Sequence, residues 1–537
     1  MHKHPTTRNL EHLEFGSRFV AELPADPETR NFPRQVLGAC YSHVTPTRVA
    51  APSLITHSSE MLDELGLNRE AVDSASFAEV LAGNRLLPGM TPHATCYGGH
   101  QFGHWAGQLG DGRAINLGEV RGASGQFLTL QLKGAGRTPY SRTADGLAVL
   151  RSSIREFLCS EAMHHLGIPT TRALSLVGTG ETVIRDMFYD GNPRPEPGAI
   201  VCRVAPSFTR FGHFEIFAAR GEIDPLRRLV DFTVRHDFPH IQAKPSIDTT
   251  LDWFAEVCRR TAELIVEWQR VGFVHGVMNT DNLSILGLTI DYGPYGWIDD
   301  YNPDWTPNTT DAAGRRYRFG HQPRIAHWNL VRLAQALHPL IGAVEPLQAA
   351  LDEYPRRFES GWRDMMARKL GFRSYEPASD DELTEELLKL LPMIETDMTI
   401  FYRQLAQIGP ELADAAPETL VAPIAPAWYQ PDAATPEYRA RLLRWLRDYC
   451  RRLQSDGSLP DTRIARMNAA NPCYVLRNYL AQMAIDRTEQ GDASLIGELL
   501  EVLRHPYDAQ PGQERFADKR PDWARHRAGC SMLSCSS

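Results

Sequence analysis

The feature that most constrains this chain's fold is an apolar stripe that runs directly into a polar turn. Apolar residues recur at three- and four-residue intervals, the spacing of one helix face, at Leu251, Phe254, Cys258, Ala262, Ile265 and Trp268. The predicted helix ends at Gly272 and leads into His275-Gly-Val-Met-Asn-Thr-Asp-Asn282. Residues 283–290 read as two short strands, and Asp291-Tyr-Gly293 follows them. The pattern predicts a helical region that holds Asn282 and Asp291 at opposite ends of one hairpin.

The chain before this helix carries strand signals. Residues 96–136 are rich in glycine, and Phe127–Leu132 alternates in the manner of a β-strand. Lys133 closes this predicted strand. A helix follows, which Asp145-Gly146 can cap and which carries Glu156. Two further strand-like segments lie near residues 172–186 and 199–205. The first half of the chain is therefore predicted to be rich in β-structure.

Together the two halves predict an α+β fold in which a β-rich lobe precedes a helical lobe. Residues 327–420 look largely helical, and a Pro/Ala-rich linker at 421–436 precedes a basic helix near 437–453 and a polar tail. A chain of 537 residues is expected to form two or three structural units. The predicted units are an N-terminal extension that packs on the core (1–95), a β-rich lobe (96–214), a helical lobe (215–420), and a C-terminal helical extension with a Cys-containing tail (421–537).

Composition narrows the class of protein. The hydrophobic content of 42% is that of a globular protein, and the net charge of −9 gives no basic footprint for nucleic acid or an anionic membrane. No apolar run approaches the length needed to span a bilayer, and the N-terminus does not resemble a secretory signal. The nine scattered cysteines favour reduced thiols over a disulfide framework. We therefore expect a cytoplasmic protein with no nucleic-acid or membrane partner.

Two features of the first half point to phosphate binding. In the run Gly107–Glu119, Gly110 and Gly112 lack a Cβ, so backbone amides could approach phosphate oxygens closely. Taken alone, a plain hairpin turn between two strands explains this run at least as well. Lys133 could neutralise a phosphate if Glu156 fixed its ammonium group, although a solvated salt bridge between surface groups would give the same pattern.

The second half adds a candidate metal site. Asn282 and Asp291 could converge on one Mg²⁺ through oxygen atoms, since that ion keeps waters and substrate phosphates as its other ligands. The alternative is that Asp291 caps a turn and Asn282 satisfies backbone groups. The complete order of Gly-rich run, strand lysine, helix glutamate, amphipathic helix, His-x₆-Asn and Asp-x-Gly is that of a kinase-type ATP site. It predicts a protein-kinase-like two-lobed fold, with a β-rich N-lobe and a helical C-lobe.

One position breaks the kinase pattern. In the kinase motif His-Arg-Asp-x₄-Asn the catalytic aspartate stands two positions after the histidine. Here that position is Val277, which cannot accept a proton from a hydroxyl group. The only nearby carboxylate in this loop is Asp281. The chain is therefore either an inactive kinase or an enzyme with rearranged chemistry.

Long runs of this sequence resemble the selenoprotein O family, called YdiU in bacteria, over nearly the whole chain. The runs that carry the resemblance are Tyr97–Gly103, Gly110–Arg113, Leu117–Glu119, Gln131–Gly146, Arg151–Glu156, His275–Asn282 and Asp291–Pro294. The resemblance implies a protein adenylyltransferase on a pseudokinase fold, which transfers AMP from ATP to Ser, Thr or Tyr hydroxyls of proteins and releases pyrophosphate. It implies that ATP binds in the reverse of the kinase direction, and it leaves UTP open as a second nucleotide.

The resemblance also assigns roles to residues. Asp281 would be the catalytic base, Asn282 and Asp291 would bind Mg²⁺ or Mn²⁺, and Glu156 would support Lys133. The nucleotide would be held by Gly110, Gly112, Arg113, Lys133, Asp145, Gly146, Arg203, Arg210 and Asp291. Cys535, near the end of the chain, stands where animal members carry selenocysteine and suggests a redox role.

The residues themselves leave alternatives open. Arg203 lies in an apolar strand, where an unpaired guanidinium would be costly, so either an anionic ligand or a salt bridge explains it. Arg210 could be a solvated loop cation, and Asp145 could be only a helix cap. A kinase-like phosphotransferase, an inactive nucleotide-binding pseudokinase and a redox protein that depends on Cys535 remain alternatives to the adenylyltransferase.

Overall fold

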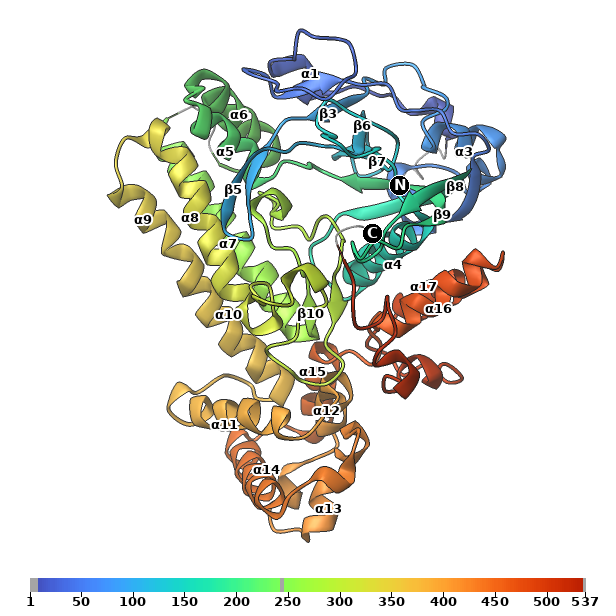
Figure 1. Cartoon of the computed structure of the whole chain (residues 1–537). Helices are drawn as coiled ribbons and strands as arrows, with labels where there is room; N and C mark the ends of the chain where they lie inside the picture. The colour runs from blue at the N-terminus through green and yellow to red at the C-terminus, as the bar shows by residue number, and fades with distance from the viewer. Residues whose placement is uncertain (1–7, 242–245, 535–537) are drawn as a thin grey trace, which may run out of the picture.

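The computed structural model describes residues 8–241 and 246–534 of the chain (Figure 1). Its first half forms an antiparallel sheet of seven strands in the order β1-β3-β6-β7-β9-β8-β2. These strands are β1 Tyr41–His43, β2 Ser53–His57, β3 His93–Thr95, β6 Ala114–Arg121, β7 Phe127–Lys133, β8 Arg172–Arg185 and β9 Arg194–Ala205. The strands predicted at 127–132, 172–186 and 199–205 are confirmed as β7, β8 and most of β9.

The first 95 residues contribute β1, β2 and β3, so the sheet runs across the predicted boundary at residue 96. The same stretch forms three short helices, α1 Arg18–Glu22, α2 Ser59–Leu65 and α3 Ala75–Leu81. The three boundaries between the four predicted units stay a prediction.

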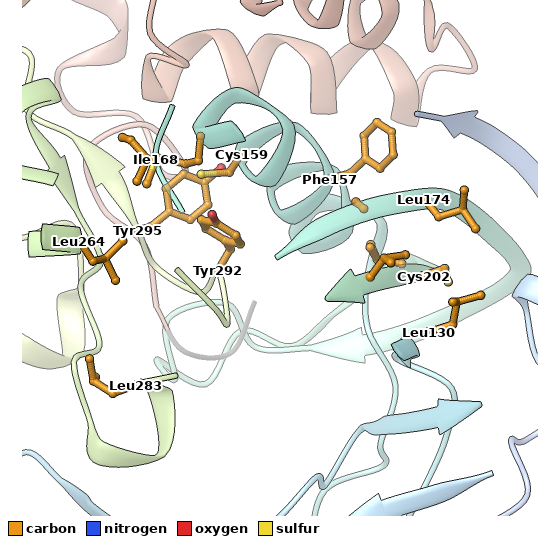
Figure 2. Packing of buried hydrophobic residues seen from close by; sticks show 14 of the residues in the cluster. Leu130, Phe157, Cys159, Ile168, Leu174, Cys202, Leu264, Leu283, Tyr292 and Tyr295 are labelled. Atoms are coloured by element: carbon orange, nitrogen blue, oxygen red, sulfur yellow. The ribbon is translucent and has the colours of Figure 1, made fainter. Parts of the chain in front are cut away.

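Helix α4 (Leu150–His165) connects the sheet to the rest of the molecule. Figure 2 shows Phe157 on one side of this helix directed toward the sheet, near Leu174 of β8, with Cys202 of β9 nearby. On its other side Cys159 faces Tyr295. All five of these side chains are buried, and full burial of a large apolar side chain is worth about 1.5–3 kcal/mol. This packing fixes the position of α4 and of Glu156, which it carries.

The helical region follows the sheet (Figure 1). Its helices are α5 Phe211–Arg220, α6 Ile223–Asp237, α7 Ile247–Val271, α8 Gln322–Ile341, α9 Glu345–Leu351 and α10 Glu353–Leu370. The predicted amphipathic helix is confirmed as α7, which Ser246 caps and which ends at Gly272. Gly272 has a φ of 78°, a left-handed conformation that favours glycine. A two-stranded pair, β10 Phe273–Val274 and β11 Gly296–Trp297, comes directly after α7.

The C-terminal part contains more helix than the sequence predicted. The helices are α11 Pro377–Leu390, α12 Met398–Leu405, α13 Pro417–Val421, α14 Pro436–Asp456, α15 Pro460–Ala470, α16 Asn478–Glu489 and α17 Ser494–Leu503. Helix α14 contains the predicted basic helix near 437–453. Three further helices follow it where a polar tail was expected, and α16 and α17 pack against α4. Within the described residues, no helix combines the length and apolarity required to span a membrane.

The predicted hairpin at residues 283–290 is wrong. This segment makes only single bridges, Arg210 with Ser284 and Thr170 with Thr289. Its backbone bonds instead go to distant parts of the chain, for example from the Thr289 amide to the Pro169 carbonyl at 2.8 Å. Local alternation of residue types cannot reveal such long-range partners, which explains the error.

The Gly-rich run does not form a hairpin either. A separate ribbon of two strands, β4 Gly98–Gln101 and β5 His104–Gln108, precedes it, and β6 after it belongs to the large sheet. Residues 109–113 therefore connect two different sheets. The predicted helix cap at Asp145 is also wrong, because α4 begins at Leu150 with no side-chain cap at Val149.

Candidate active site

A cleft of about 880 Å³ gathers residues from the sheet and from the segment after α7. Every residue predicted to hold nucleotide or metal, or to act as the base, lines it: Gly110, Gly112, Arg113, Lys133, Asp145, Gly146, Arg203, Arg210, Asp281, Asn282 and Asp291. Glu156 lies behind this wall, on the buried face of α4. The structure thus brings the predicted site residues to one place, while their roles stay predictions.

Lys133 and Glu156 form a buried ion pair. The Lys133 Nζ lies 2.5 Å from the Glu156 Oε2, and both side chains are at least nine-tenths buried. Burial lowers the pKa of Lys133 from its ordinary value, and the charge of Glu156 opposes that change. The solvated surface pair that the sequence left open does not apply to this buried contact.

Asp291 stands at the centre of three cations. Arg203 donates to its Oδ1 at 2.6 Å, Arg210 donates to its Oδ2, and the Lys133 Nζ lies 4.0 Å away. Burial opposes ionisation, but Arg210, Arg203 and Lys133 together hold the pKa of Asp291 well below its ordinary value. Asp291 also has a φ of 55°, a left-handed conformation that is costly for a residue with a Cβ and that occurs preferentially at functional sites.

The two arginines of this cluster are fully buried but incompletely paired. Arg203 also bonds Glu156 at 3.1 Å and contacts Gln131, and Arg210 donates to the Asp281 carbonyl at 2.8 Å. The Nε atoms of both arginines are buried without a hydrogen-bond partner in the described part of the chain. Arg203 therefore takes part in salt bridges and also faces the cleft, and Arg210 is not a solvated loop cation.

Asp281 lines the cleft, and its two carboxylate oxygens differ in their bonding. Its Oδ2 accepts a hydrogen bond from the Gln101 Nε2 at 3.2 Å. Its buried Oδ1 has no partner among residues 8–241 and 246–534. Burial raises the pKa of Asp281 to about 7. A carboxyl group with this pKa and one unpaired oxygen has the properties of a general base.

The remaining loop residues fit a hard cation. The Asn282 Nδ2 donates to the Val277 carbonyl at 2.9 Å, which commits the amide nitrogen and leaves the oxygen as its ligand atom. Asn282, Asp291 and Asp281 then supply only oxygen donors, the type that Mg²⁺ prefers, and the Asp281 Oδ1 is unpaired. Val277 also lines the cleft, at the position where a kinase has its catalytic aspartate.

Two of the predicted glycines are required by close packing. A Cβ at Gly110 would lie 2.5 Å from the Tyr140 ring, and one at Gly146 would lie 2.3 Å from the backbone of Gly136. Both have positive φ, which glycine adopts at little cost.

Asp145 is held by Arg185, which donates two hydrogen bonds to its carboxylate at 2.7 and 2.8 Å.

The cleft is more basic than the chain as a whole. Its lining contains seven basic side chains, Arg113, Lys133, Arg137, Arg142, Arg185, Arg203 and Arg210, and five acidic ones, Asp111, Asp145, Asp186, Asp281 and Asp291. The whole chain carries a net charge of −9. A cationic cleft in an acidic protein is suited to a polyanionic ligand.

Sequence reasoning missed Gln101, Arg137, Arg142 and Arg185, all of which line the cleft. Arg137 and Arg142 follow Lys133 at short intervals in a Gly-containing segment, and this spacing was a signal for both arginines. Arg185 and Gln101 had no local signal, because their partners Asp145 and Asp281 lie 40 and 180 residues away.

The predicted redox residue Cys535 lies outside the described residues. Eight cysteines fall within them, and all eight are free thiols. Burial raises the pKa of Cys530 to about 11, so this neighbouring thiol is not activated.

Comparison with known proteins agrees with the geometry of the site. The sequence profile of the family described as "Protein adenylyltransferase SelO" matches residues 31–504. The chain is 62% identical to the "Protein nucleotidyltransferase YdiU" of Rhodopirellula baltica, over 98% of this chain and 99% of that protein. It is 60% identical to the protein of the same name from Aromatoleum aromaticum, over 98% of this chain and the full length of that protein.

A kinase-type arrangement of lysine, glutamate, asparagine and aspartate around a basic cleft defines a nucleotide-dependent transferase. The chain belongs to the protein adenylyltransferase SelO family, and it is a nucleotidyltransferase enzyme of that family.

Proposed function

We propose that this enzyme transfers AMP from ATP to Ser, Thr or Tyr hydroxyls of proteins and releases pyrophosphate. The observation that carries the proposal is the placement of two groups in one cleft. Lys133, Arg203 and Arg210 form a buried cationic wall, and Asp281, a carboxylate with one unpaired oxygen, lines the same cleft. Relatives named protein nucleotidyltransferases support protein as the acceptor and leave UTP open as a second donor.

The direction of the nucleotide follows from this placement. Buried cations favour the part of ATP with the highest charge density, which is the β,γ-diphosphate end. That orientation would turn the α-phosphorus toward Asp281 and the adenine ring toward the mouth of the cleft. It is the reverse of the orientation in kinases, and Val277 in the kinase base position agrees with it.

The chain's own residues would then act mainly by position and charge. Asp281 would orient the acceptor hydroxyl and take its proton, and the oxygen would attack the α-phosphorus. Lys133 and the two arginines would stabilise the departing pyrophosphate, with Glu156 holding the ammonium group of Lys133 in place.

Asn282 and Asp291 would hold Mg²⁺ or Mn²⁺. When bound, the ion would neutralise charge on the phosphate oxygens. In this arrangement Asp291 would exchange part of its contact with Arg203 and Arg210 for the cation, which frees guanidinium donors for phosphate. Gly110, Gly112 and Gly146 would let the backbone approach the nucleotide, with Arg113 and Asp145 at its border.

We also propose that the fold is protein-kinase-like and two-lobed. The antiparallel sheet with its strand lysine and the glutamate of α4 corresponds to a kinase N-lobe, and the helices from α5 onward to a C-lobe. Extensions precede and follow these lobes. A cytoplasmic location and the lack of nucleic-acid and membrane partners stay predictions.

Parallel reactions with α-labelled and γ-labelled ATP test the function. Label transferred to protein from the α-position alone, with release of pyrophosphate, is the expected result. Transfer from the γ-position alone would show that the enzyme is a kinase-like phosphotransferase. Nucleotide binding without transfer of either label would show an inactive pseudokinase.

A further inference from the structure

The β4–β5 ribbon, Gly98–Gln101 and His104–Gln108, lies directly against the loop that carries Asp281. Three consecutive residues, at the end of β4 and in the turn that follows it, donate hydrogen bonds to this loop. The His100 amide donates to the Thr280 Oγ1 at 2.7 Å, and the Gln101 side chain donates to the Asp281 Oδ2 at 3.2 Å. The Phe102 amide donates to the Asn279 Oδ1 at 3.3 Å. Each residue from 279 to 281 is thus bonded by one residue of the ribbon.

The contact between Gly99 and Asp281 is closer than any other residue type would allow. A Cβ at Gly99 would lie 2.6 Å from the Asp281 Oδ1 and 2.9 Å from the Asp281 Cβ. Gly212 of α5 approaches the Gly98 carbonyl so closely that its own Cβ would lie 2.1 Å away. The ribbon therefore packs closely against both α5 and the Asp281 loop, with no room for larger residues at these contacts.

The ribbon is also anchored away from the loop. The His100 Nδ1 lies 2.6 Å from the Glu215 Oε1 on α5, and the His100 ring packs against Trp328 of α8. At the tip, the Tyr317 hydroxyl bonds both the Phe102 amide and the Asn279 side chain, at 2.8 and 2.6 Å. These anchors fix Gln101 relative to α5 and α8, neither of which contributes a residue to the lining of the cleft.

From this geometry we infer that the β4–β5 ribbon is the element that orients the catalytic carboxylate, and that Gln101 is its positioning residue. The amide of Gln101 holds the Asp281 Oδ2 and Gly99 packs against the Oδ1, so the ribbon fixes the plane of the carboxylate that would take the proton of the acceptor hydroxyl. Kinases do not need such a device at this position, because their base stands two residues after the histidine, where this chain has Val277. The inference rests on the proposed function, since it takes Asp281 as the base.

The variant Gln101→Leu tests the inference, because it removes the amide donor and keeps a side chain of similar length. We expect kcat for AMP transfer from α-labelled ATP to protein to fall 10- to 100-fold, with KM for ATP within about 2-fold of the parent value. A misplacement of a catalytic group by about 1 Å can cost this much. The matched control is His104→Leu, because His104 is exposed and lies opposite Gln101 in the ribbon. It should keep the parent kcat.

A double-mutant cycle separates positioning from a general loss of structure. If Gln101 acts through Asp281, then Gln101→Leu should cause no further loss of kcat in an Asp281→Ala background. An additive loss, a rise in KM for ATP in proportion to the fall in kcat, or an unchanged kcat in Gln101→Leu would overturn the inference. If the parent enzyme transfers no α-label, the proposed function fails first, so the two failures are distinguishable.

Discussion

Two buried clusters of arginine and aspartate in this molecule have similar composition and very different surroundings. In the cleft, Arg203 and Arg210 hold Asp291. In the C-terminal part, Arg477 bonds Asp397 at 2.8 and 3.0 Å and Asp299 at 3.1 Å. The cleft cluster leaves the Nε atoms of both arginines buried without a partner, whereas Arg477, Asp397 and Asp299 leave no buried side-chain atom unpaired in the described structure. The neighbouring Arg520 also has an unpaired Nε, but none of these four residues lines the cleft.

The pKa directions of the two clusters also differ. In the cleft, three cations hold the pKa of Asp291 well below its ordinary value despite burial. In the C-terminal cluster burial dominates for Asp299 and raises its pKa to about 6, although Arg477 and Arg520 oppose this. The cleft therefore has an excess of positive charge that a ligand can use, while the C-terminal cluster is closed. Buried ion pairs alone do not mark a functional site; incomplete pairing beside a cavity does.

The strongest test of this comparison is Asp291→Ala. Loss of the proposed metal ligand and of the central anion should lower AMP transfer by at least 10³-fold, about 4 kcal/mol in transition-state stabilisation. Transfer of label from α-labelled ATP measures this loss. The melting temperature should fall as well, because the buried Arg203 and Arg210 lose their shared anion, so the activities are compared at a temperature where circular dichroism shows the variant to be folded. Activity within 10-fold of the parent would show that Asp291 stabilises the fold and has no catalytic role.

The corresponding change in the closed cluster is Arg477→Met. It leaves Asp397 and Asp299 buried without their cation, which should destabilise the fold by about 3–5 kcal/mol. Denaturant unfolding measures the loss. The double variant Arg477→Met with Asp397→Leu should recover part of the stability, because it also removes a buried charge. If KM for ATP rose in a folded double variant, the cluster would not be purely structural.

The sequence predicted the parts of the site that depend on local pattern. Lys133 at a strand end, the stripe of α7 and the Asn282 and Asp291 motifs all follow from spacing within short segments. The hairpin at 283–290 was predicted wrongly, because its partners lie elsewhere in the chain. Arg477 had no signal at all, since Asp397 lies 80 residues away and no motif connects them. Long-range pairing is the information that periodicity does not contain.

A smaller effect is expected for Arg203→Lys. Lysine keeps the charge, but its single nitrogen cannot reproduce the planar fork with which one arginine nitrogen bonds Glu156 and Asp291 and the other bonds Gln131. We expect kcat/KM for ATP to fall about 10-fold, which is about 1.4 kcal/mol. Initial rates at varied ATP concentration measure this change. The matched substitution Arg477→Lys should leave kcat/KM unchanged and reduce stability, so equal effects of both on kinetics would remove the distinction between the clusters.

The smallest expected effect is the pH dependence of the closed cluster. Because the pKa of Asp299 is raised to about 6 in the folded state, the folded chain binds more protons than the unfolded chain between about pH 4 and 6. The stability of the fold should therefore decrease as pH rises through this window. Above the window, the full free-energy cost of keeping Asp299 ionised and buried should be present. Asp299→Asn removes this dependence, so its unfolding free energy relative to the parent should rise by about 1–3 kcal/mol between pH 4 and pH 7.5. Denaturant unfolding at the two pH values measures the difference. A relative stability that stays constant or falls with pH would show that Arg477 and Arg520 outweigh burial, and that the two clusters are electrostatically alike.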